Sequence, residues 1–224
     1  MRLVATAMVA MCLACPVFGA GITPPQLSTD LEAQGTRLYE LNNNKPYVDD
    51  YPEVMTMWSD ATDRSSVVQS DIAAIADLRA LIGDLRKNGT QHSTPAGLTQ
   101  TQLDSCNANM AKLASGTTLT KKTQMLNAKD AAASAYGAAL SARDLTDSMS
   151  TNDPIEDQEV AIEDLECKVA AFTGANNDYQ TALAASYSES WSTWQDLGSN
   201  ITTTAARKTA LEELLSQLIQ DGWE

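Results

Sequence analysis

Apolar residues recur every three or four positions along most of this chain, and no stretch alternates apolar with polar residues at period two. Since a spacing of three and four marks one face of an α-helix, an all-α fold is predicted. The first helical stretch follows Pro24-Pro25, ends at a polar break over 42–45, and carries Leu27, Leu31, Leu38 and Leu41 on one face. A second begins near Asp50 and either runs on or stops near Asp63.

The next two helices have clear beginnings and ends. A helix over 66–87 is predicted to close at Asn88-Gly89, and its apolar face holds Val68, Ile72, Ile75, Leu78, Ile82 and Leu85. Thr99 and Gln102 have the spacing of a capping box. They therefore predict the start of a helix that ends at Gly116 and aligns Leu103, Cys106, Met110 and Leu113.

Residues 120–197 show heptad spacing in two successive stretches, which predicts a long antiparallel helical hairpin. Thr120 is expected to cap the first helix, whose seam is mostly alanine and consists of Met125, Ala128, Ala132, Ala135, Ala139, Ala142 and Met149. Asp153 is the predicted N-cap of the return helix, with Pro154 first inside it and Glu156 as the third-position acceptor. The return seam is Ile155, Gln158, Ile162, Leu165, Val169, Phe172, Asn176, Tyr179 and Leu183.

The C-terminal part is predicted to be a separate short helix. Gly198 is expected to break the return helix, and the last helix aligns Leu211, Leu214, Leu215 and Leu218. The expected fold is an elongated helical bundle built on the hairpin at about 120–197, with a smaller helical side lobe at about 43–116. Residues 21–224 are expected to form a single domain.

The N-terminus has the pattern of a secretory signal peptide. Arg2 precedes an apolar and small-residue run over 3–17, and Gly19 and Ala20 provide small residues for cleavage after either one. The run is short for a bilayer span, and no later stretch approaches the ~20 apolar residues that a transmembrane helix needs. We therefore expect residues 1–20 to be removed and the mature chain to be exported, to a periplasmic, cell-surface or extracellular location.

The net charge of the chain limits the partners that it can bind. The formal net charge is −14, and it becomes −15 when Arg2 leaves with the leader. Such a chain repels phosphates, so nucleic-acid binding is not expected.

Cys106 and Cys167 are the cysteines that remain after cleavage, and in an oxidising compartment they predict one disulfide, which could stabilise the fold by about 4 kcal/mol. Two buried thiols are the alternative.

No catalytic, metal or cofactor pattern is visible in the sequence. His92 is the sole histidine and lies among turn-forming residues, where a solvated loop position is the simpler interpretation. The acidic pairs Asp49/Asp50 and Glu212/Glu213 lack the spacing of a calcium loop, and no glycine-rich phosphate loop occurs. The prediction is a non-enzymatic protein without a cofactor.

Two further features concern partners and modification. Tyr187, Trp191 and Trp194 are spaced i, i+4 and i+7, so they share a helix face and either pack beneath a terminal helix or anchor a partner protein. Asn88-Gly89-Thr90 and Asn200-Ile201-Thr202 are formal N-glycosylation sequons, which matter only in a eukaryotic host.

The hairpin resembles the minor pilin subunit family of conjugative type IV secretion systems. The matching residues are Ala135-Tyr136 before the turn and the run 161–170 after it, with shorter echoes at Gly21-Ile22 and at 82–88. The resemblance implies a non-enzymatic subunit at the tip of a secretion pilus, with pilin or other envelope secretion components as partners. The alternative from the residues alone is a free-standing secreted helical binding protein, an antigen or effector, that engages a host ligand.

Overall fold

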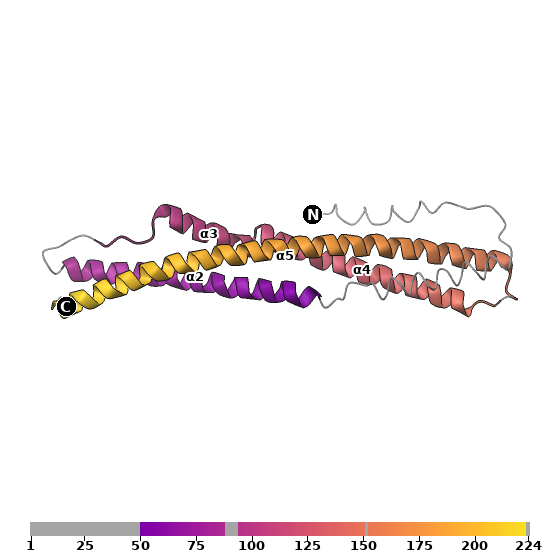
Figure 1. The fold of residues 1–224 in the computed structure, drawn as a ribbon, viewed down its shortest axis with the longest axis horizontal. Coiled ribbons are helices and arrows are strands. Elements are labelled where there is room, and N and C mark those ends of the chain that lie inside the picture. The colour runs from indigo at the N-terminus through magenta and orange to yellow at the C-terminus, as the bar shows by residue number, and fades with distance from the viewer. Residues whose placement is uncertain (1–49, 88–93, 151, 223–224) are drawn as a thin grey trace. The chain divides into compact units, whose positions relative to one another are not determined.

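The computed structural model describes residues 50–87, 94–150 and 152–222, which form four helices and contain no strand. They are α2 (Asp50–Lys87), α3 (Gln100–Ala114), α4 (Thr117–Ser148) and α5 (Ile155–Gln220) (Figure 1). The all-α prediction is confirmed. The predicted leader, the stretch carrying Leu27 to Leu41 and the polar break over 42–45 lie outside the described residues.

The chain divides into two compact units, and both α4 and α5 contribute to each. Among the described residues, unit 1 holds Met125–Ala182, and unit 2 holds Asp50–Gln124 with Leu183–Gly222. None of the described helices combines the length and apolar content needed to cross a membrane.

Unit 1 contains the helical hairpin that the heptads predict. Its core cluster joins α4 to α5 and consists of Ala139, Ala142, Leu165, Val169 and Phe172. The Phe172 ring lies 5.0 Å from the Tyr136 ring, centroid to centroid, at an interplanar angle of 52°. Alanine on the α4 seam leaves room for the larger side chains of α5, so small residues on one helix match large ones on the other.

The helix starts were predicted less accurately. The α3 capping box is confirmed, because Thr99 Oγ1 accepts from Gln102 N at 3.2 Å and Gln102 Oε1 accepts from Thr99 N at 2.9 Å. However, α4 begins at Thr117 rather than at a Thr120 cap, and the Gly116 carbonyl accepts the Thr120 N–H. A side chain on Gly116 would collide with the Lys112 backbone, so only glycine lets α3 and α4 meet here.

The start of α5 is also displaced by one residue. The Pro154 carbonyl accepts from the N–H groups of Asp157 and Gln158, so Pro154 takes the position predicted for Asp153. The Asp153 carboxylate instead accepts from the Ser150 N–H at 2.7 Å and closes the turn. Gln158, rather than Glu156, reaches back, and its Nε2 donates to the Asp153 carbonyl at 2.8 Å.

Unit 2 is built on α2, which runs without a break from Asp50 to Lys87 and so does not stop near Asp63. Buried residues recur every seven positions along it: Val54, Ala61, Val68, Ile75 and Ile82. The last four pack in two clusters with buried residues of α3 and of the C-terminal part of α5, among them Leu197, Leu211 and Leu218. A strict seven-residue repeat is the pattern of coiled-coil packing.

The buried side of α5 is unusually polar within unit 2. Ser186, Ser190, Thr193, Asn200 and Thr204 are all buried there. Three of them form hydrogen-bonded layers with three different helices. Thr193 Oγ1 lies 2.8 Å from Thr118 Oγ1 of α4, Asn200 binds α3, and Thr204 Oγ1 donates to Asp71 Oδ2 of α2 at 3.0 Å.

Asp71 also belongs to an ion pair. It is only 7% exposed, and Lys208 Nζ lies 3.2 Å from its Oδ1. The carboxylate therefore has one charged and one neutral donor, which is the condition under which a carboxylate can be buried.

Gly198 does not break the return helix, contrary to the prediction. The α5 helix continues through it to Gln220, so the expected separate C-terminal helix is the end of α5. A side chain at Gly198 would collide with the Arg64 guanidinium. The glycine is thus used for close approach between helices rather than for a helix end.

The predicted disulfide is not formed, and Cys106 and Cys167 are both thiols. Cys106 is buried in the cluster that α3 shares with Leu197, and its neighbours on α5 lie between Trp194 and Ile201. The prediction failed because α3 packs against that later part of α5, whereas Cys167 precedes it by 27 residues and belongs to unit 1. Burial raises the pKa of the Cys106 thiol, with a smaller opposing effect from a backbone hydrogen bond.

Candidate functional site

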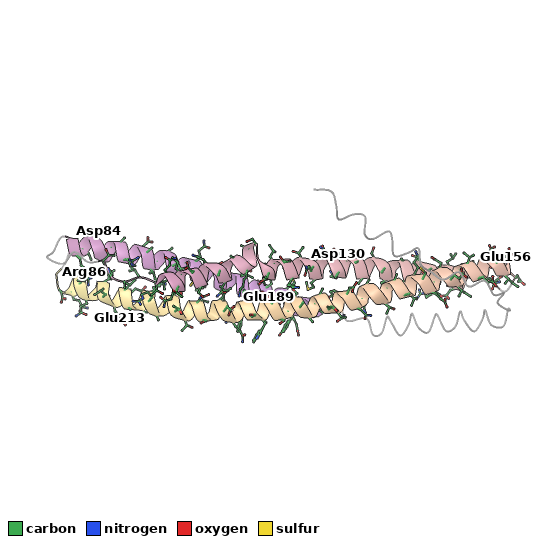
Figure 2. The ribbon with its side chains drawn as sticks, turned by 90° about the horizontal axis from the view of Figure 1, so that it is seen from above. Asp84, Arg86, Asp130, Glu156, Glu189 and Glu213 are labelled. Carbon is green, nitrogen blue, oxygen red and sulfur yellow. The ribbon has the colours of Figure 1, made fainter. Side chains whose placement is uncertain are left out.

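Among the described residues, no group of three or more His, Cys, Asp or Glu side chains could hold a metal ion. Glu212 and Glu213 are exposed on α5, and Figure 2 labels Glu213. His92 and Asp49 lie outside the described residues.

The three predicted aromatic residues do lie together on α5, but they divide into two environments. Tyr187 and Trp191 are 41% and 39% exposed, whereas Trp194 is half-buried against the core cluster of unit 2. The Trp191 and Trp194 rings are stacked, with centroids 4.9 Å apart and planes at 16°. Trp194 therefore packs inward, against residues of α2 and α3, while Tyr187 and Trp191 face solvent and their role as an anchor stays a prediction.

Arg64 of α2 contacts both the ring and the backbone carbonyl of Trp194. Its Cζ lies 3.5 Å from the Trp194 ring centroid, and its Nη1 donates to the Trp194 carbonyl at 3.0 Å. A guanidinium and an indole cannot share one face of Trp194 at these distances, so they flank the ring. Arg64, Trp194 and Trp191 form a three-layer arrangement, which we call the aromatic stack, and it holds Trp191 in place before any partner binds.

The exposed residues of α5 around the stack are uncharged. Between Leu183 and Ala206 every exposed residue is uncharged, and we call this surface of α5 the neutral face: Ala184, Tyr187, Ser188, Trp191, Ser192, Gln195, Ser199, Thr202, Ala205 and Ala206. The two acidic residues in this stretch, Glu189 and Asp196, are half-buried and already bound. Glu189, labelled in Figure 2, accepts from Thr117 and Thr118. Asp196 pairs with Lys112 Nζ at 2.8 Å.

A second cation lies over a tryptophan in unit 2. Lys122 Nζ of α4 is 4.2 Å from the Trp58 ring centroid, and Trp58 packs against the same core cluster as Trp194. Partial burial lowers the pKa of Lys122 through desolvation. Neither this contact nor that of Arg64 with Trp194 could be predicted from sequence, because each joins residues distant in the chain.

The structure describes the asparagine of only one of the two sequons. Asn88 lies outside the described residues. Asn200 is 7% exposed, its Nδ2 donates to Ser105 Oγ at 3.3 Å, and its Oδ1 accepts from Asn109 Nδ2 at 2.8 Å. A glycan on Nδ2 would have to displace α3, so the folded chain does not accommodate one at Asn200.

We predict that the effect of Gly198→Ala depends on Arg64. Alanine favours a helix interior over glycine by about 1 kcal/mol, but here its Cβ would displace the guanidinium from the Trp194 carbonyl and ring. In an Arg64→Ala background the substitution should therefore stabilise by about 0.5–1 kcal/mol, and with Arg64 present the gain should vanish or reverse. Urea denaturation of the four variants measures this coupling, and additive effects would refute it.

The aromatic stack and the neutral face are thus the candidate site, which lies on an exposed surface of α5. A search for resemblance to protein-family models, to curated proteins and to solved structures found no match for this chain.

Proposed function

We propose that this chain is an exported, non-enzymatic structural subunit that binds a protein partner through the neutral face, as a minor-pilin-like component of a type IV secretion system. The observation that carries the proposal is the exposure of Tyr187 and Trp191 among uncharged exposed residues of α5. Tyr, Trp and Arg are the residues most often found to dominate binding energy at protein interfaces.

The aromatic stack favours binding because its ordering precedes association. A tryptophan side chain that is already stacked loses little further rotamer freedom when a partner covers it. Tyrosine and tryptophan also offer large contact areas with few rotatable bonds, and the neighbouring serines can adapt their hydrogen bonds. A helix surface of this composition supports a protein-binding role.

The export and secretion parts of the proposal are supported by the sequence. They rest on the leader pattern over 1–20 and on the resemblance at Ala135-Tyr136 and 161–170. Four apolar members of that run are buried in unit 1, namely Ala161, Ile162, Leu165 and Val169, whereas Ala170 is exposed. The resembling residues therefore support a shared architecture, while the proposed binding surface lies elsewhere on α5.

The experiment is fractionation of cells that naturally make the chain, with the protein followed in sheared pili, envelope and medium. Wild type should appear with the sheared pili or the secretion complex, and a Tyr187→Ser/Trp191→Ser variant should be exported and helical but lost from that fraction. Val160→Ser is the matched control, because Val160 is an exposed apolar residue of α5 away from the neutral face. Wild type found only free in the medium would favour a free-standing secreted binding protein instead.

A further inference from the structure

We propose that the partner on the neutral face is a second copy of this chain, packed antiparallel about a twofold axis that passes near Gln195. This inference rests on the proposed function, since it names the occupant of the same surface. Gln195 is exposed and lies midway between Ala184 and Ala206, the ends of the neutral face. An antiparallel pair centred there covers the neutral face of each copy with that of the other.

The first argument is electrostatic. Each chain has a formal net charge of −14, so two copies repel one another over most orientations. The start of α5 is instead strongly acidic, since residues 156–166 contain five acidic residues besides Glu156, which Figure 2 labels, and no basic one. The neutral face lets two acidic copies meet without placing unpaired carboxylates against each other, because the partly exposed Asp196 carboxylate is paired with Lys112.

The second argument is shape. Large rings occupy one end of the neutral face, at Tyr187 and Trp191, and small side chains occupy the other, at Ser199, Thr202 and Ala205. An antiparallel pair about Gln195 brings position 191 of one copy opposite 199 of the other, and 187 opposite 203. Large residues then meet small ones, and because the pair is isologous each such contact forms twice.

Gln195 provides the sharpest test because it meets its own copy on the axis. Gln195→Glu would place two carboxylates together at the centre of the contact, which should weaken the dimer at least about tenfold. Gln217→Glu adds the same charge at another exposed position of α5, outside the neutral face, and should change the dimer less than about twofold. Trp191→Ala should weaken it about 100-fold, roughly tenfold for each of two equivalent contacts.

The measurement is sedimentation equilibrium of the purified mature chain over a concentration series at low and high salt. We expect a monomer–dimer equilibrium that strengthens with salt, because salt screens repulsion between the acidic copies while the contact itself is uncharged. A chain that stays monomeric throughout would overturn the proposal. So would a dimer that Gln195→Glu and Gln217→Glu affect equally, or one that salt dissociates.

The two proposals fail in distinguishable ways. A wild-type chain that is monomeric alone, yet fractionates with pili in a manner that requires Trp191, overturns self-association and points to a different protein on the same face. If the chain dimerises through Gln195 and Trp191 but is absent from the pilus and secretion fractions, self-association is supported and the secretion role is overturned.

Discussion

Replacing Phe172 with alanine should lower the free energy of unfolding by about 3–5 kcal/mol. The side chain is 1% exposed and lies at the centre of the unit 1 core, against Tyr136 and the α4 seam. Its neighbours Ala139 and Ala142 are too small to move into the vacated space, so the cavity should persist. The measurement is the urea midpoint followed by far-ultraviolet circular dichroism.

The matched control is Val160→Ala on the same helix. Val160 is 65% exposed, so losing its methyl groups should cost less than about 0.5 kcal/mol. Comparable losses from the two substitutions would show that the α4–α5 core of unit 1 does not hold Phe172 as described.

Replacing Lys208 with methionine should destabilise unit 2 by about 2 kcal/mol. The change leaves the buried Asp71 carboxylate with the Thr204 hydroxyl as its remaining described donor. A carboxylate without a countercharge is expensive to bury, although the partial exposure of Lys208 keeps the loss below that of a fully buried pair. Chemical denaturation near neutral pH measures the loss.

The companion variant is the double substitution Asp71→Asn/Lys208→Met. A neutral amide needs no countercharge and can still accept from the Thr204 hydroxyl, so the double variant should regain at least half of the lost stability. If adding Asp71→Asn instead deepens the loss, the ion pair matters less than the shape and hydrogen bonding of Asp71 itself.

Much of this fold could be predicted from sequence, because its helices are marked by periodic apolar residues and by capping patterns between nearby residues. Ile162, Leu165 and Val169 repeat at heptad spacing, and they are buried as that spacing predicts. The Thr99 capping box needs only residues three apart, so it could be identified without tertiary context. Helix starts such as Thr117 were missed by a few residues, since a carbonyl such as that of Gly116 can begin a helix without a favoured side-chain cap.

The failures share a different cause, which is contact between residues far apart in the chain. Gly198 suggests a helix end until Arg64, 134 positions earlier, is seen to occupy the space of its missing side chain. The pairing of Cys106 with Cys167 assumed that α3 packs near the start of the return helix. Helical periodicity identifies the apolar face of each helix, but it does not identify which segments of two helices pack against each other.

The candidate site could be predicted in part for the same reason. Helical spacing placed Tyr187, Trp191 and Trp194 on one face, but it could not tell which of them is exposed, because that depends on Arg64 and α2. The neutral face did leave a signal in the sequence, since residues 183–206 contain only two charged side chains. Recognising it required knowing that Glu189 and Asp196 are half-buried and bound.

The polar layers of unit 2 have a consequence for how the chain finds its native alignment. Long helices with repeating apolar seams can slide past one another by a heptad and still bury similar surfaces. A seven-residue slip of α2 along α5 would move Asp71 from Thr204 to Leu197 or Leu211, leaving a carboxylate without its partners in an apolar layer. Asn109 with Asn200, and Thr118 with Thr193, oppose sliding of α3 and α4 in the same way. Shifted packings should therefore be short-lived traps rather than competing end states, and the chain gives up some apolar burial to exclude them.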